Sequence, residues 1–205
     1  MSRTKNRAAI SSARRNKKRP GPADLARAVN KGLRDVIAPG LKVLFVGINP
    51  GLYSAATGHH FARPGNRFWP ALHQAGFTPR QLDPSQQAEL LQGGYGITNM
   101  VNRGTATADE LEVDEFVKGR QRLAAKVRRY RPEVVAFLGV GAYCHAFGLR
   151  SAGIGRQSQA FEGAHVWVLP NPSGLNANYQ LPALVKLFRA LRLAGVSSQE
   201  SEHGD

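Results

Sequence analysis

The sequence predicts an α/β fold, a single domain in which a parallel sheet is covered by helices on both faces. Short, strongly apolar runs, typical of buried strands, occur at residues 42–47, 95–101, 133–139 and 165–170. The segments between them carry apolar residues at helical spacing. Strands that alternate with helices along a chain form parallel sheets buried on both sides.

The predicted helices follow from periodicity and from where Pro and Gly interrupt it. Leu25, Val29, Leu33 and Ile37 recur four residues apart, which predicts a helix over residues 23–37 before the turn at Pro39 and Gly40. The other helices are expected at residues 66–77, 115–130, 141–149 and 181–195. No internal repeat is visible.

Charge defines the ends of the chain and the class of partner. Residues 1–20 hold eight Lys or Arg and no acid, so we expect a basic tail that does not fold alone, followed by one domain over residues 21–195 and a polar tail over residues 196–205. The formal net charge of +14 favours nucleic acid as the partner, with an acidic membrane surface as the second choice.

Several classes of protein are disfavoured. No apolar run is long enough to span a bilayer, and the amino terminus lacks the apolar core of a secretory signal. Cys144 is the single cysteine, so no intrachain disulfide and no cysteine cluster can form. We therefore expect a cytoplasmic, nucleoid-associated monomer without a membrane partner.

Two strands deliver polar loops at their carboxyl ends. The run 43–47 continues into Ile48, Asn49 and Pro50, and the strand at 165–170 continues into Asn171 and Ser173. Loops at the carboxyl ends of parallel strands share one crevice. No acid occurs at residues 36–82 or 163–199, as expected of a surface that lies against phosphates, so neither loop supplies a carboxylate base.

Cofactor motifs are weak. Gly139 and Gly141 follow a strand, but Cys144 stands where a dinucleotide-binding loop has its third glycine, and no Walker lysine follows any glycine loop. His59 and His60 are neighbours that point to different sides, with no third ligand evident, so no metal site is expected.

The two loops resemble a known family. GINPGLYSAATGHHFARPGNRFWPALHQAGF at residues 47–77 and VLPNPSGL at 168–175 are similar to the signature segments of the mismatch-specific uracil/thymine DNA glycosylases, a branch of the uracil-DNA glycosylase superfamily. The similarity extends from about Ile37 to Leu193. It implies a three-layer α/β/α sandwich with a mostly parallel four- to five-stranded sheet, and excision of uracil or related pyrimidines opposite guanine with no metal or cofactor.

The resemblance also implies roles for individual residues. Asn49 matches the catalytic asparagine that positions the attacking water, which is chemically sensible because an amide orients water but takes no proton at neutral pH. Ile48 and Phe61 match backbone contacts to the base, and the Phe61 ring matches the residue that stacks on it. Asn171 stands where faster uracil glycosylases carry histidine. Tyr53 is a departure, bulky where small residues are common near the pocket wall.

The second segment matches the family's wedge. Leu175 corresponds to the leucine that fills the space of a base flipped out of the duplex, while Gly174 and Asn176 match contacts to the opposite guanine and Ser173 a phosphate contact. Ala177 stands two positions after the leucine, where a known member of the family has an arginine, and this departure puts wedge strength and opposite-base selectivity in question.

Plainer roles stay open for each residue. Asn49 also fits a helix cap or an Asx turn, Asn171 an ordinary turn, and Phe61 the core. Asp109 is the candidate carboxylate for catalysis, but Thr107 to Glu110 also reads as a capping box.

The sequence thus predicts a monofunctional glycosylase acting on double-stranded DNA. The alternatives are a non-catalytic basic module that binds nucleic acid or damage, and a nucleotide-using Rossmann-like enzyme. The seven Lys or Arg between Lys118 and Arg131 could be a rim that faces DNA or a solvated helix face.

Overall fold

The computed structural model describes residues 19–200, with side chains to residue 195. The predicted basic tail lies outside the described residues except for its last two positions. The predicted polar tail is described only to residue 200, and there the chain continues as the last helix, which runs five residues beyond the expected end at 195.

A five-stranded sheet forms the middle layer, in the order β2-β1-β3-β5-β4. Its strands are β1 Val43–Gly47, β2 Tyr95–Asn99, β3 Val134–Leu138, β4 Gly155–Arg156 and β5 His165–Leu169. β1 pairs in parallel with β2 and β3, and β3 pairs in parallel with β5. The short β4, absent from the prediction, pairs antiparallel with β5 at the edge. The predicted fold class and the four predicted strands are confirmed.

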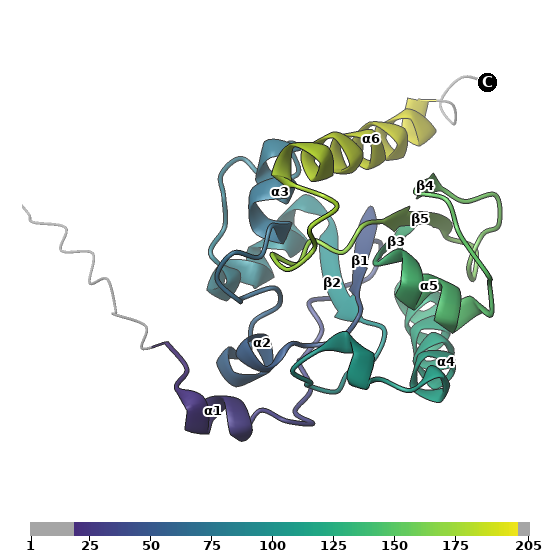
Figure 1. Ribbon diagram of the computed structural model, residues 1–205. Coiled ribbons are helices and arrows are strands. Elements are labelled where there is room, and N and C mark those ends of the chain that lie inside the picture. Colours follow the sequence, from purple (N-terminus) through teal and green to yellow (C-terminus); the bar gives the residue numbers. More distant parts are fainter. Residues whose placement is uncertain (1–18, 201–205) are drawn as a thin grey trace, which may run out of the picture.

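Helices cover both faces of this sheet (Figure 1). α3 and α6 lie together over one face, and α4 and α5 over the other. The α-helices are α1 Pro22–Ala26, α2 Leu52–Thr57, α3 Phe68–Gln74, α4 Val113–Tyr130, α5 Val140–Phe147 and α6 Leu181–Glu200, and the 3-10 helices are η1 Pro84–Gly93 and η2 Ala108–Glu110. The expected helices at 66–77, 115–130, 141–149 and 181–195 are present.

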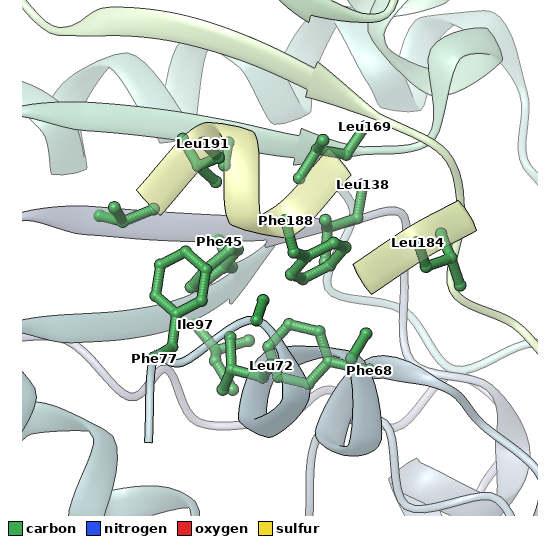
Figure 2. Close-up of a cluster of buried hydrophobic side chains, with 14 of the residues drawn as sticks. Phe45, Phe68, Leu72, Phe77, Ile97, Leu138, Leu169, Leu184, Phe188 and Leu191 are labelled. Atoms are coloured by element: carbon green, nitrogen blue, oxygen red, sulfur yellow. The ribbon is translucent and has the colours of Figure 1, made fainter. Parts of the chain in front are cut away.

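The strands are apolar throughout because successive side chains enter two different cores. Phe45 packs with Phe68 and Phe188 on the α3 and α6 side, as Figure 2 shows, whereas its neighbours Leu44 and Val46 pack under α4 and α5. The ring of Phe45 lies 5.5 Å from that of Phe68, edge to face. A strand buried on both faces cannot alternate apolar with polar residues.

The helix predicted over residues 23–37 is wrong beyond its first turn. α1 ends at Ala26, and Asn30 adopts φ 62°, outside the helical region. The side chain of Asn102 instead binds the backbone of Leu33. Its Oδ1 accepts from Leu33 N–H at 2.7 Å, and its Nδ2 donates to Leu33 C=O at 3.0 Å. Val36 then forms an antiparallel bridge with Ile97 of β2. Tertiary hydrogen bonds thus replace the helical ones that periodicity predicted.

Within residues 19–200 no helix is long and apolar enough to cross a membrane.

Candidate active site

A pocket of about 390 Å³ opens at the carboxyl edge of the sheet. From β1 the chain first builds β2 on one side and then β3 on the other, so this edge contains the topological switch point where α/β proteins bind ligands. The loops after β1, β2 and β5 all line it, together with Leu138 at the end of β3. We call it the central pocket. Its predicted residues are Ile48, Asn49, Phe61, Asp109, Asn171, Ser173, Leu175 and Asn176.

Asn49 is held by a defined hydrogen-bond network. Its Nδ2 donates to Arg103 O at 2.8 Å and to Thr105 Oγ1 at 2.6 Å. The Thr105 hydroxyl donates in turn to Thr107 O at 2.7 Å, so its oxygen must accept from Asn49. With both amide hydrogens committed, Oδ1 is the atom that Asn49 can offer to a ligand. It is an acceptor, as positioning a water molecule requires.

Phe61 forms an aromatic wall. Its ring stacks on Phe68, with centroids 4.2 Å apart and planes at 25°, and Phe61 lines the central pocket. The backbone of Phe61 has φ 53°, a region that bulky side chains rarely adopt and that is often found at functional sites. The ring is therefore braced by the core while remaining half-buried and open to the pocket.

Asn99, which sequence reasoning missed, lies at the end of β2 and lines the same pocket. The side chain is 7% exposed, and its buried Nδ2 has no hydrogen-bond partner among the described residues. A buried amide without a partner costs about 1–3 kcal/mol, so a site that retains one commonly has a use for it. The signal was the polar pair Thr98 and Asn99 closing an otherwise apolar strand.

Gly47 makes this arrangement possible. A Cβ atom at that position would lie 2.6 Å from Asn99 Oδ1 and 3.2 Å from the Phe61 ring. Any larger residue at the end of β1 would push the two side chains away from the pocket.

Asn171 forms a turn and also lines the central pocket. Its Oδ1 accepts from Ser173 N at 3.0 Å, the Asx turn that we considered as an alternative. The same bond leaves Nδ2 as a donor on the pocket wall, because no described residue accepts from it. Asn49 and Asn171 therefore offer an acceptor and a donor to the pocket, and Asn99 adds a buried donor that has no partner among the described residues.

The neighbouring histidines point to different sides, as expected. His60 is buried and lines the central pocket, where its Nε2 donates to Arg34 O at 3.0 Å, and burial lowers its pKa, which keeps the ring neutral at pH 7. His59 lies in a second hollow beyond α2, which we call the neighbouring groove, bounded by Arg19, Arg27, Lys31, Tyr53 and Asp83 among others. The structure places Tyr53 in that groove and not on the central pocket.

Asp109 lies at the rim of the central pocket and is exposed. The capping box that we considered as its alternative role is formed by Glu110, whose carboxylate accepts from Thr107 N at 2.9 Å. Asp109 is the one acidic side chain lining the pocket.

The loop over residues 171–180 projects Leu175 into solvent. The leucine side chain is 69% exposed, the most exposed large apolar residue in the described part of the chain. Gly174 packs against the backbone of Gly65, where a Cβ would lie 2.5 Å from Gly65 O. Ser173 Oγ accepts from Leu175 N at 3.3 Å, which leaves its hydroxyl hydrogen for another acceptor.

The basic stretch 118–131 is not brought to the central pocket at its carboxyl end. Arg131 follows the end of α4 and precedes β3, at the amino edge of the sheet. Lys126 and Arg128 form ion pairs with Asp35 and Glu162. Among the described residues no three His, Cys, Asp or Glu side chains are grouped so that they could hold a metal ion.

Comparison with known proteins agrees with this architecture. The family model described as the uracil DNA glycosylase superfamily matches residues 34–192. The chain belongs to the uracil DNA glycosylase superfamily. Its fold is also similar to the solution NMR structure of a candidate uracil DNA glycosylase from Methanosarcina acetivorans, with a TM-score of 0.56 and 18% sequence identity over 80% of this chain and 99% of the other. At that identity the likeness concerns the fold.

Proposed function

We propose that this member of the superfamily is a monofunctional DNA glycosylase that excises uracil mispaired with guanine. The observation that carries the proposal is the fixed amide of Asn49, which leaves Oδ1 as its free acceptor and lines a pocket of about 390 Å³ with one aromatic wall and a single carboxylate at its rim. Thymine and other modified pyrimidines are further candidate substrates of the same pocket.

The reaction follows from these groups. Asn49 Oδ1 accepts a hydrogen bond from water and directs its oxygen at C1′ of the deoxyribose. As the C1′–N1 bond breaks, the electron pair leaves with the uracil, the water oxygen bonds to C1′, and one water proton passes to solvent. The product is an abasic site.

Stabilisation of the departing base is assigned to donors that are already in place. Uracil leaves as an anion, so the Nδ2 groups of Asn99 and Asn171 act where negative charge develops on its oxygens. The backbone N–H groups of Ile48 and Phe61 are proposed as further contacts, and the Phe61 ring stacks on the base. No metal or cofactor takes part in this proposal.

The exposed Leu175 supports a base-flipping step. A base must leave the duplex to reach a pocket of this kind, and an apolar wedge fills the vacated space. Opening costs less at a mismatch, which favours G·U pairs. Gly174 and Asn176 are proposed to contact the opposite guanine, and the free hydroxyl hydrogen of Ser173 a phosphate. The proposed partner is double-stranded DNA, bound by a monomer.

A labelled duplex with one central G·U pair tests the proposal. Wild-type protein is incubated with it in EDTA, and alkali then cleaves any abasic site. We expect cleavage by the wild type and a rate at least about 10²-fold lower for Asn49→Ala, because a misplaced nucleophile costs that much. Binding without cleavage by either protein would place the chain in the damage-binding class.

Asp109 is the second candidate for the chemistry, as a carboxylate near the water or the developing positive charge on the sugar. If Asp109→Ala retains the full single-turnover rate in the same assay, Asp109 has no part in the mechanism.

A further inference from the structure

One arginine holds the 171–180 loop. The guanidinium of Arg67 is half-buried beneath the loop and meets acceptors along its whole length. Nη1 donates to the carbonyl oxygens of Ser173, Asn176 and Tyr179 at 2.9–3.1 Å, and Nη2 to Gly174 O at 3.3 Å and Gln180 Oε1 at 3.1 Å.

The backbone adds to this attachment. Arg67 N donates to Pro172 O at 2.9 Å, and the Gln180 side chain that accepts from Arg67 donates to Ala177 O at 3.2 Å. Arg67 immediately precedes α3, whose residues Phe68 and Trp69 are buried in the core. The loop is thus fastened to a rigid element that also braces the Phe61 ring.

Apolar packing does not hold the middle of the loop. Gly174, Leu175, Ala177 and Asn178 are exposed, and the partly buried Tyr179 and Leu181 pack on the core only at its far end. Polar contacts must therefore keep Leu175 in place, and Arg67 supplies more of them than any other side chain in the described structure.

We propose that Arg67 is the positioning residue of the 171–180 loop and, through it, of the Leu175 wedge. The inference rests on the proposed function, because it assigns Arg67 to the opening of the duplex and not to the chemistry. An arginine in a DNA-binding protein commonly contacts phosphate, but both terminal nitrogens of Arg67 are engaged within the protein. The planar guanidinium group spreads its donors so that they reach acceptors on several sides at once. The compact ammonium group of a lysine cannot do this, so a lysine cannot replace Arg67.

The consequence is selective. Without the hydrogen bonds from Arg67, the loop that carries Leu175 must become ordered as the leucine enters the duplex. This ordering costs conformational entropy, so excision from paired DNA slows. Uracil that is already unpaired needs no wedge, and its excision continues.

The test compares one uracil in two settings, a G·U pair in a duplex and the centre of an unpaired bubble, under single-turnover conditions. The variants are Arg67→Gln and Arg67→Lys. Arg192→Gln is the matched control, because Arg192 is also half-buried and also donates to a backbone carbonyl, Ala75 O at 2.8 Å, but lies away from the loop. Amide hydrogen exchange of residues 173–180 is measured on the same proteins by mass spectrometry, in the presence and in the absence of DNA.

For both Arg67 variants we expect roughly a tenfold loss on the duplex, a change of less than about threefold on the bubble, and faster exchange in the loop, with Arg192→Gln like the wild type. Equal losses on both substrates, or unchanged exchange in the loop, would overturn the inference while leaving the proposed function intact. If the wild type excises uracil from neither substrate, the proposed function is refuted, and with it the wedge role. The exchange data would then decide only whether Arg67 orders the loop.

Discussion

The walls of the central pocket and the 171–180 loop are two halves of one site that are held in different ways. Asn99 and Phe61 are set by the end of a buried strand and by stacking on the core, whereas Leu175 is 69% exposed and stands in a loop whose carbonyl oxygens accept hydrogen bonds from Arg67. The difference indicates a division of work. In the proposed function the pocket fixes donors against a base, where small displacements matter, and the loop delivers an apolar side chain to a separate target.

The largest effect in this comparison is expected from the pocket. Asn99→Ala removes a donor proposed to face the uracil anion, and we expect excision to slow by about 10- to 150-fold on paired and unpaired uracil alike, since a hydrogen bond to a charged group contributes about 1.5–3 kcal/mol. Single-turnover rates on both substrates measure it. Thermal unfolding is the control that the variant remains folded at the assay temperature, and removing Asn99 Nδ2 breaks no hydrogen bond within the described protein.

A smaller and more selective effect is expected from the loop. Leu175→Ala should slow excision from a G·U duplex about tenfold and leave unpaired uracil unaffected, because the wedge offsets part of an unstacking cost of a few kcal/mol. Leu149→Ala, which truncates another exposed leucine at the end of α5, is the matched control. A loss of equal size on both substrates would mean that Leu175 contributes to the pocket and not to opening.

The smallest effect concerns the support behind Asn49. The carbonyl oxygen of Arg103 accepts from Asn49. The guanidinium of Arg103 donates from Nε and Nη2 to the two carboxylate oxygens of Glu115, at 2.7 and 2.8 Å. This hydrogen bonding lowers the pKa of Glu115 from 4.5 to about 2. A carboxyl group with a lowered pKa stabilises the fold above its ordinary pKa, and this contribution disappears as the pH falls from about 4.5 towards 2.

We therefore expect Glu115→Gln to lower the melting temperature at pH 7 by at most about 4 °C, with the difference from wild type vanishing towards pH 2. Glu89→Gln, which removes the partner of Arg80 in a more exposed ion pair, is the control. Thermal unfolding followed by circular dichroism across this pH range provides the measurement, and a constant difference would contradict the assignment.

Periodicity predicted the fold because the central strands and helices obey it. Strands β1, β2, β3 and β5 are apolar runs whose two faces enter different cores, and the helices between them carry apolar stripes that fit those cores. The same reasoning failed at residues 27–37, where the spacing of apolar residues is helical but Asn102, distant in sequence, captures the backbone of Leu33.

The candidate site divides in the same way. Asn49, Phe61 and Leu175 stand in segments whose resemblance to a family marks them, and the structure brings them to one edge of the sheet. Asn99 and Arg67 went unnoticed since one closes an apolar strand and the other looks like any basic residue before a helix. Tyr53 lies in the first of these signature segments, but α2 directs it into the neighbouring groove.

By itself the sequence determined the layered α/β architecture, the two polar loops, their lack of carboxylates and the family to which they are similar, because these depend on local composition and order along the chain. Only the tertiary structure decided which atom of Asn49 is free, that Asn99 lines the pocket and that Arg67 holds the 171–180 loop. The first and the last of these properties depend on hydrogen bonds between residues that lie 54 to 113 positions apart, and no local pattern encodes such partners.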